Sequence, residues 1–252
     1  MNERSPVKDF LDPAHGWGSV LYFQQIRMPV MCGRFEIHSA PQIIAEIFGI
    51  TEWSIEYPPQ YNIAPSQDIL IIINDGKRRI IKSRWGFVPS MSRDLNTGYR
   101  MINARAETAA SSRAFKSAFE KQRCLVVADG FYEWRKEGKT RRPFYIRLKS
   151  HKPFGFAGLY NVWKSPDGEP LTTSTIMTTD ANELIRSIHD RMPVITPADK
   201  YDIWLDPKVH DSSALLGVLH PYPPGEMELF PVTPKVNSFK YNSPESIEPL
   251  DE

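Results

Sequence analysis

The chain has 252 residues, which suits one large domain or two small ones and is long enough to bury a sizeable core. Hydrophobic residues at 41% and charged residues at 24% are ordinary for a soluble globular protein, and the net charge of +1 excludes a polycation. No apolar run approaches the roughly 18 residues of a membrane span, and two cysteines are too few for a disulfide framework, so we expect a cytoplasmic protein.

The first 30 residues differ from the rest of the chain. They show neither helical nor strand periodicity, contain Pro, Gly and Ser breakers, and lack the apolar core of a signal peptide. We interpret residues 1–30 as a disordered extension, a tag or the product of a mis-called start. Residues 31–249 are denser and predict a single domain.

The first regular elements follow soon after Met31. The stretch "SAPQIIAEIFG" predicts a helix, with Ser39 and Gln42 as a capping box and Gly49 at its C-terminal end. The stretch "ILIIINDGKRRIIKSRW" predicts two strands joined by a tight turn at Asp75-Gly76.

The second half alternates short strands with a few helices. The stretch "SSRAFKSAFEKQR" predicts a helix with one apolar face. Strands are then predicted within "CLVVADGFYEW", "RPFYIRLK", "FGFAGLYNVW", "TTSTIMTT" and "MELFPVTPKVN". We expect Asp180 to cap the helix "ANELIRSIHDR", and Thr196 with Pro197 to open "ADKYDIWLD". This order, without regular βαβ alternation, indicates an α+β fold with a β-barrel-like core of mostly antiparallel strands and peripheral helices.

Charge is unevenly distributed. Residues 77–123 contain twelve Lys and Arg against three acids, a local balance of +9. Residues 225–252 contain six acids against two lysines, a balance of −4. The basic segment is either a surface that faces a polyanion or an ordinary solvated face, and charge alone favours neither.

Two motifs offer reactive groups in the first half of the chain and at its centre. The stretch "MCGRF" contains the thiol of Cys32 and the cation of Arg34. In "ADGFYEWRK", Glu133 lies between Tyr132 and Trp134, and partial desolvation there would raise the pKa of the carboxyl group. Glu133 could equally pair with a neighbouring cation on a solvated strand.

Two further motifs offer polar and titratable side chains. In "INARAET", Asn103, Arg105 and Glu107 would share one face of an extended segment, and in "IHDRMP", His189 lies at a helix end. Each has a purely structural explanation when taken singly, and Trp85 in "RWGFVP" suits the core. No Gly-rich phosphate loop, HExxH or paired CxxC is present, so nucleotide and zinc sites lack support.

The order of these motifs resembles the SRAP family (SOS-response-associated peptidase), the abasic-site processing proteins. The resemblance covers residues 31–249 and rests on "MCGRF", "YNIAPSQ", "RWGFVP", "INARAETA", "SRAF", "ADGFYEW", "IHDRMPVI" and "VNSFKYNSPESIEPL". It implies the single α+β domain of that family, with a barrel-like core and a positively charged cleft for single-stranded DNA. It also implies a monomer, without metal or cofactor, that joins the nucleoid during DNA damage.

The resemblance assigns roles to particular residues. Catalytic roles fall on Cys32, Asn103, Glu133 and His189. DNA contacts fall on Arg34, Trp85, Arg105, Arg113, Trp134 and Arg191. The expected function is a sensor that crosslinks itself to abasic sites through the cysteine exposed by removal of Met31.

Only an N-terminal cysteine has an amine and a thiol on neighbouring carbons. The amine can form a Schiff base with the abasic aldehyde, and the thiol can then close a thiazolidine ring. Glu133 and His189 would exchange protons with the sugar, and Asn103 would orient the reacting groups. Two alternatives stay open: a cysteine peptidase limited to self-processing, using Cys32, His189 and Asn103, and a single-stranded DNA-binding module without covalent chemistry.

Overall fold

The computed structural model describes residues 33–250. The predicted extension at residues 1–30 and the predicted nucleophile Cys32 therefore lie outside the described residues. The strands are β1 Phe35–Ile37, β2 Gln60–Ile63, β3 Asp68–Asn74, β4 Arg78–Trp85, β5 Asn103–Arg105, β6 Arg123–Ala128, β7 Gly130–Glu137, β8 Thr140–Leu148, β9 Phe154–Lys164, β10 Pro170–Asp180, β11 Arg191–Pro193, β12 Ile195–Thr196 and β13 Met227–Pro231. The α-helices are α1 Pro41–Phe48, α2 Ala106–Ala109, α3 Lys116–Lys121, α4 Glu183–Arg186, α5 Tyr201–Leu205 and α6 Ser212–Leu216.

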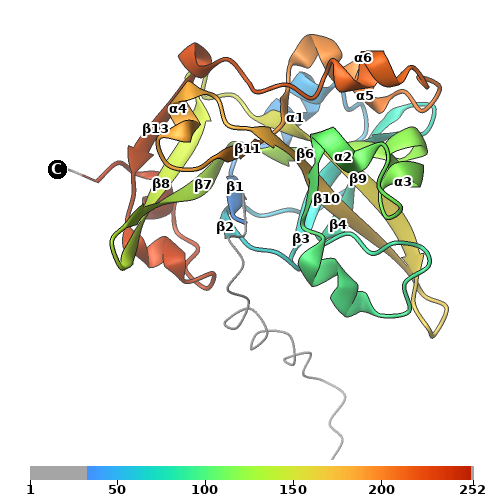
Figure 1. Cartoon of the computed structure of the whole chain (residues 1–252), viewed down its shortest axis with the longest axis horizontal. Coiled ribbons are helices and arrows are strands. Elements are labelled where there is room, and N and C mark those ends of the chain that lie inside the picture. The colour runs from blue at the N-terminus through green and yellow to red at the C-terminus, as the bar shows by residue number, and fades with distance from the viewer. Residues whose placement is uncertain (1–32, 251–252) are drawn as a thin grey trace, which may run out of the picture. The chain divides into compact units, whose positions relative to one another are not determined.

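Five strands close into a barrel. Antiparallel pairs join β4 to β3, β3 to β6, β6 to β9 and β9 to β10, and a short parallel pair of β10 with β4 completes the ring (Figure 1). Closure leaves the ring without a free edge. Three short strands extend it: β5 and β11 pair with β10, and β12 pairs with β9.

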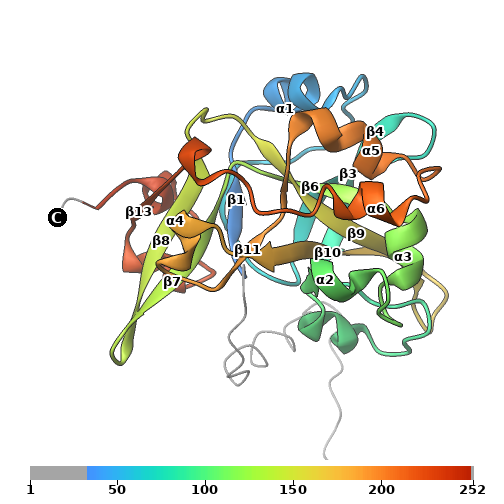
Figure 2. The same ribbon diagram turned by 45° about the horizontal axis from the view of Figure 1, so that its top comes forward.

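A second sheet, in the order β13-β8-β7-β1-β2, packs against the barrel. Figures 1 and 2 both show β13, β8 and β7 on one side of the barrel and α2 and α3 on the other. The chain passes from barrel to sheet through Asp129, between β6 and β7. The rings of Phe35 and Phe131, from β1 and β7, pack edge-on against Phe156 of β9, with centroids 6.0 and 5.8 Å from its own.

The predicted fold class is confirmed, because a barrel of mostly antiparallel strands carries short peripheral helices. The predicted hairpin is also confirmed, with β3 and β4 paired in register from Asp68 and Arg84 to Asn74 and Arg78. At the end of α1, Gly49 takes the left-handed conformation (φ 67°) that an αL cap requires. The domain boundaries stay a prediction.

Three predicted helix starts are wrong, and in two of them the predicted cap residue has another partner. Ser39 donates its hydroxyl to Asp129, so α1 begins without a side-chain cap. Asp180 pairs with Arg191, and Asn182 caps α4 instead by accepting from the amide of Ile185. The segment after β12 starts one residue later than predicted, with Pro197 in the cap position of a short 3₁₀ helix that leads into α5.

Candidate functional site

The chain has two cysteines, Cys32 and Cys124, and the structure describes the second of them. Cys124 lies in β6, is completely buried and is a free thiol. Burial raises the pKa of the Cys124 thiol well above its usual range, which disfavours the nucleophilic thiolate. Cys124 is therefore inert, and Cys32 remains the candidate.

The described chain begins next to the predicted acid–base residue Glu133. Phe35 of β1 lies opposite Phe131 of β7, and the carbonyl of Arg34 accepts a hydrogen bond of 3.0 Å from the amide of Tyr132. Continuing this antiparallel register, Gly33 reaches the level of Glu133. The Glu133 side chain is 2% exposed, so a carboxyl group lies buried where the described chain starts.

The aromatic neighbours of Glu133 do not enclose it as predicted. Successive side chains of a strand point to opposite faces, which places Glu133 on the face of Phe131, toward the barrel. Tyr132 and Trp134 are on the other face, where a second apolar cluster packs against the C-terminal segment. The desolvation of Glu133 thus comes from the barrel side.

Arg34 fixes the C-terminal segment. Its guanidinium donates to Asn62 Oδ1 at 2.7 Å and to the carbonyl of Val236 at 2.9 Å, and it lies 5.8 Å from the centre of the Trp134 ring. Trp134 in turn donates its indole N–H to Asn237. Burial lowers the pKa of Arg34 to about 10, which still leaves it charged at neutral pH. Both predicted DNA contacts are therefore already engaged within the protein.

Trp85 is a core residue that supports the strand of Asn103. It is completely buried, so the prediction that its ring contacts DNA is wrong. Its indole N–H donates to the carbonyl of Ile102 at 3.0 Å. Asn103 itself is half-buried and lies opposite Ile176 in the parallel pair of β5 with β10. The barrel strand β10 and the Trp85 indole together set the position of Asn103.

His189 has two partners that require different protonation states. Nδ1 accepts the amide N–H of Arg191 at 3.1 Å, which requires an unprotonated nitrogen. The same atom lies 2.9 Å from a carboxylate oxygen of Asp190, and that contact requires a proton. Asp190 is 88% exposed, so water competes for its carboxylate. We therefore favour the neutral ring, with the proton on Nε2.

Arg191 joins three elements instead of facing solvent. It forms a bidentate ion pair with Glu107 (2.5 and 2.8 Å), pairs with Asp180 (2.6 Å) and donates to the carbonyl of Thr178. Because α2 begins at Ala106, Glu107 does not continue the extended face of Asn103 as predicted. The ion pair with Arg191 lowers the pKa of Glu107.

The two other predicted DNA contacts are accessible. Arg105, at the end of β5, and Arg113, before α3, are both exposed. Within residues 33–250, neither forms an ion pair. Both are near the segment of Asn103 in sequence, so they are the predicted arginines best placed to contact phosphates.

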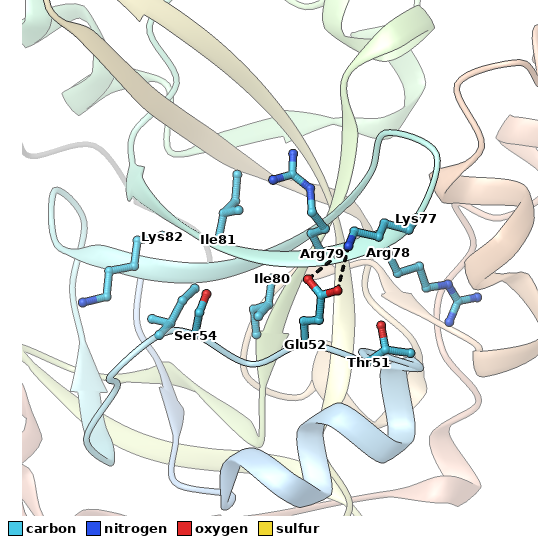
Figure 3. Close-up of a pocket in the computed structure, with 10 residues that line it drawn as sticks. Thr51, Glu52, Ser54, Lys77, Arg78, Arg79, Ile80, Ile81 and Lys82 are labelled. Carbon is cyan, nitrogen blue, oxygen red and sulfur yellow. Dashed lines mark hydrogen bonds and ion pairs between the residues drawn. The ribbon is translucent and has the colours of Figure 1, made fainter.

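The basic segment that begins at Lys77 lines a separate cavity of about 390 Å³ between β4 and the chain after α1 (Figure 3). Most of its cations are neutralised: Lys77 pairs with Glu52, Arg78 with Asp202, and Arg79 with Asp75. This part of the local +9 balance therefore supports a solvated face more than a nucleic-acid surface.

A further polar cluster went unnoticed in the sequence. His38 Nδ1 lies 2.8 Å from Glu36 Oε2, and the other oxygen of Glu36 accepts the Tyr145 hydroxyl at 2.6 Å. Asp129 accepts the amides of His38 and Ser39 at 2.7 and 2.8 Å. Burial raises the pKa of Glu36 to about 7. The signal in the sequence was the spacing of two residues between Glu36 and His38, at the end of one short strand.

Comparison with known proteins finds a family profile and several relatives that match most of the chain. The profile of the family described as "SOS response associated peptidase (SRAP)" matches residues 31–239. The "Abasic site processing protein YoqW" of Bacillus subtilis is 49% identical over 222 residues, which cover 86% of this chain and 99% of that protein. The "Abasic site processing protein HMCES" of Xenopus tropicalis is 29% identical, over 85% of this chain and 77% of that protein.

Solved structures have the same fold. An X-ray crystal structure of a protein from Bacteroides thetaiotaomicron matches with a TM-score of 0.78 and 25% identity, over 87% of this chain and all of that one.

Among the described residues, no helix has the length and apolar character needed to cross a bilayer.

Proposed function

The chain belongs to the SOS response associated peptidase (SRAP) family, and from that premise we propose that it processes abasic sites in single-stranded DNA by crosslinking itself to them through Cys32. The names of its relatives support the abasic site as the substrate, since YoqW and HMCES are both named abasic site processing proteins. The geometry supports the chemistry, since the buried carboxyl of Glu133 lies at the level of Gly33, the residue bonded to Cys32.

The proposed reaction needs Cys32 at the N-terminus. Its free α-amine adds to the aldehyde of the opened deoxyribose, and loss of water gives an imine. The thiol then adds to the imine carbon and its proton moves to the nitrogen, which closes a five-membered thiazolidine. An amide nitrogen at position 32 cannot form the imine, so residues 1–31 must be absent from the active protein.

Glu133 and His189 supply the proton transfers. A buried carboxyl group can protonate the departing hydroxyl of the carbinolamine, which leaves as water, and can relay the thiol proton during ring closure. The unprotonated Nδ1 of His189 is held by the Arg191 amide, which leaves Nε2–H to donate to the sugar oxygen. Asn103 orients the lesion with neutral hydrogen bonds from a strand that the barrel fixes.

A denaturing gel tests the proposal directly. Protein that begins at Cys32 is incubated with a single-stranded oligonucleotide containing one abasic site. A band of protein bound to DNA is expected for the wild type and for Cys124→Ala, whose thiol is buried, and no band for Cys32→Ala. A band of equal intensity from Cys32→Ala, or from protein that retains residues 1–31, would contradict the ring-forming reaction.

The role of Glu133 has its own test in the same gel. Glu133→Gln keeps the shape of the side chain but cannot exchange a proton, so we expect crosslinking to slow by about 10²-fold. Unchanged kinetics would remove Glu133 from the mechanism. A variant that still binds abasic DNA without crosslinking would show that recognition and chemistry are separate.

Self-processing is the second candidate, because the family description includes a peptidase. It would use Cys32 to release residues 1–31 and so expose its own amine. Intact mass spectrometry of purified wild type and Cys32→Ala distinguishes the possibilities. A mass that begins at Cys32 only in the wild type supports self-processing, whereas residues 1–31 intact in both exclude it under those conditions.

A further inference from the structure

We propose that Glu36, His38 and Asp129 form a binding site for a divalent transition-metal ion such as Zn²⁺, with water as a fourth ligand. The three side chains offer one imidazole nitrogen and two carboxylate oxygens that all lie within 4.8 Å of one another. Imidazole and carboxylate are common zinc ligands, and three protein ligands plus water is a known zinc coordination. The site is separate from Cys32 chemistry and does not depend on it.

The distances need only a small adjustment to fit an ion. Zinc bonds of about 2.0–2.2 Å in tetrahedral geometry separate the ligand atoms by about 3.3–3.5 Å. His38 Nδ1 is 3.6 Å from Asp129 Oδ2, so the Asp129 carboxylate lies within reach of an ion bound to the imidazole. The same nitrogen is 2.8 Å from Glu36 Oε2, a hydrogen-bond distance that must widen by about half an ångström when the ion replaces the proton on Nδ1. That proton leaves to solvent.

The local charge favours a cation. Glu36 is 0% and Asp129 is 6% exposed, so two neighbouring carboxyl groups are held away from water. Buried carboxylates are normally paired with cations or coordinate metals. Within the cluster, His38 is the cationic partner of the carboxylates. Arg147, which lies opposite Gly130 in the sheet, pairs with Glu228 instead.

Outer hydrogen bonds hold the proposed ligands in place. The Tyr145 hydroxyl fixes Glu36, while the amides of His38 and Ser39 and the Ser39 hydroxyl fix Asp129. A carboxylate has about four lone-pair directions. The two amides take those of Oδ2 and the Ser39 hydroxyl takes one of Oδ1, so the open direction of Asp129 is on Oδ1. Such supporting contacts are what orients ligands at metal sites. The His38 side chain is 40% exposed, which gives an ion access from solvent.

The ion would join two segments that are far apart in the sequence. Glu36 and His38 come from β1 and the residue after it, and Asp129 is the residue between β6 and β7. These are the strands that bring the start of the described chain beside Glu133. The proposed metal therefore stabilises the frame of the site and takes no part in its chemistry.

Calorimetric titration of the full chain with Zn²⁺, after removal of metals by a chelator, tests the site. The wild type is expected to bind one equivalent that Glu36→Gln and His38→Gln each weaken at least about tenfold, and Tyr145→Phe by about 10–100-fold. His151→Gln, an exposed histidine paired with Glu228, is the matched control and should keep wild-type affinity. Cys32→Ser should also keep it, since the thiol is not a ligand.

A second readout covers variants that fold poorly. Bound Co²⁺ should give the visible absorption of a tetrahedral site in the wild type, and Zn²⁺ should raise its melting temperature but not that of Glu36→Gln. Absence of saturable binding by the wild type would overturn the proposal. Binding that survives in both Glu36→Gln and His38→Gln, or is lost in Cys32→Ser alone, would also overturn it.

Discussion

At the scale of single residues, exposure separates the predicted DNA contacts into two groups. Arg34 and Arg191 are engaged with protein partners, whereas Arg105 and Arg113 are exposed. A guanidinium held by a bidentate carboxylate has little left to offer a phosphate. We therefore expect the exposed pair to carry most of the electrostatic affinity for DNA.

Substitution of the exposed arginines checks this division. Arg105→Ala and Arg113→Ala should each weaken binding to single-stranded DNA and reduce the salt dependence of log K by about 0.7 per phosphate lost. Fluorescence anisotropy across a series of salt concentrations measures both effects. Arg135→Ala, a half-buried arginine paired with Glu137, is the control and should leave the slope unchanged.

His189 gives a second prediction at this scale. In His189→Asn the side-chain oxygen takes the place of Nδ1 and can still accept the Arg191 amide, but the residue no longer exchanges a proton. Crosslinking should slow by about 10²-fold, while binding of intact single strands is unchanged. Equal crosslinking rates for the variant and the wild type would contradict the role of His189.

At the scale of elements, Asn62 on β2 holds the C-terminal segment. Its amide group donates to the carbonyls of Val236, Ser238 and Tyr241, and its oxygen accepts from Arg34. Asn62→Ala leaves these buried groups unsatisfied, so the free energy of unfolding should fall by about 1–3 kcal/mol. Amide hydrogen exchange should speed up in the C-terminal segment first. The exposed Asn96→Ala should change neither quantity.

The ion pair of Glu107 and Arg191, which links α2 to β11, predicts a pH dependence. The folded-state pKa of Glu107 is lowered, so its contribution to stability is present above the unfolded pKa of about 4.3. It is lost as the pH falls through the folded pKa. Urea unfolding should thus find Glu107→Gln less stable than the wild type near neutrality and equal to it in acid. A difference that persists in acid, or one of similar size for the exposed Glu120→Gln, would contradict this.

Some elements could be predicted from the sequence because their signals are local. The turn at Asp75-Gly76 and the left-handed Gly49 depend on neighbouring residues alone. The Asp180 cap could not be predicted, since Arg191 reaches it only when β10 and β11 pair. The same holds for the cluster of Glu36 and Asp129, which are about ninety residues apart and meet through the pairing of β1 with β7.

The site residues were recognised by family resemblance, and the structure adds the faces on which they lie. Trp85 and Trp134 were both predicted to contact DNA, yet one is in the core and the other packs on the C-terminal segment. Strand alternation alone puts the side chains of Glu133 and Trp134 on opposite faces of their strand. The sequence does not say which of these faces is buried more deeply. The answer depends on the packing of the second sheet against the barrel.

At the scale of the whole molecule, the barrel depends on close contact between β9 and β10. A Cβ at Gly158 would lie 2.9 Å from the carbonyl of Thr175 and 3.0 Å from the sulfur of Cys124. Gly158→Ala should therefore lower the free energy of unfolding by about 1–3 kcal/mol through overpacking, measured by chemical denaturation. Gly225→Ala has open space around it and serves as the control. Equal loss in both variants would contradict the packing explanation.

The parallel pair of Arg84 and Thr173 that closes the ring has a consequence for biosynthesis. The amino end leaves the ribosome first, yet β10, which holds Asn103 in place through β5, is made only after residue 170. Under the proposed function, Cys32 leaves the ribosome before Asn103 has β10 beside it and before His189 is made. Crosslinking would then begin only after both are in place, which would keep shorter nascent chains from attaching to DNA.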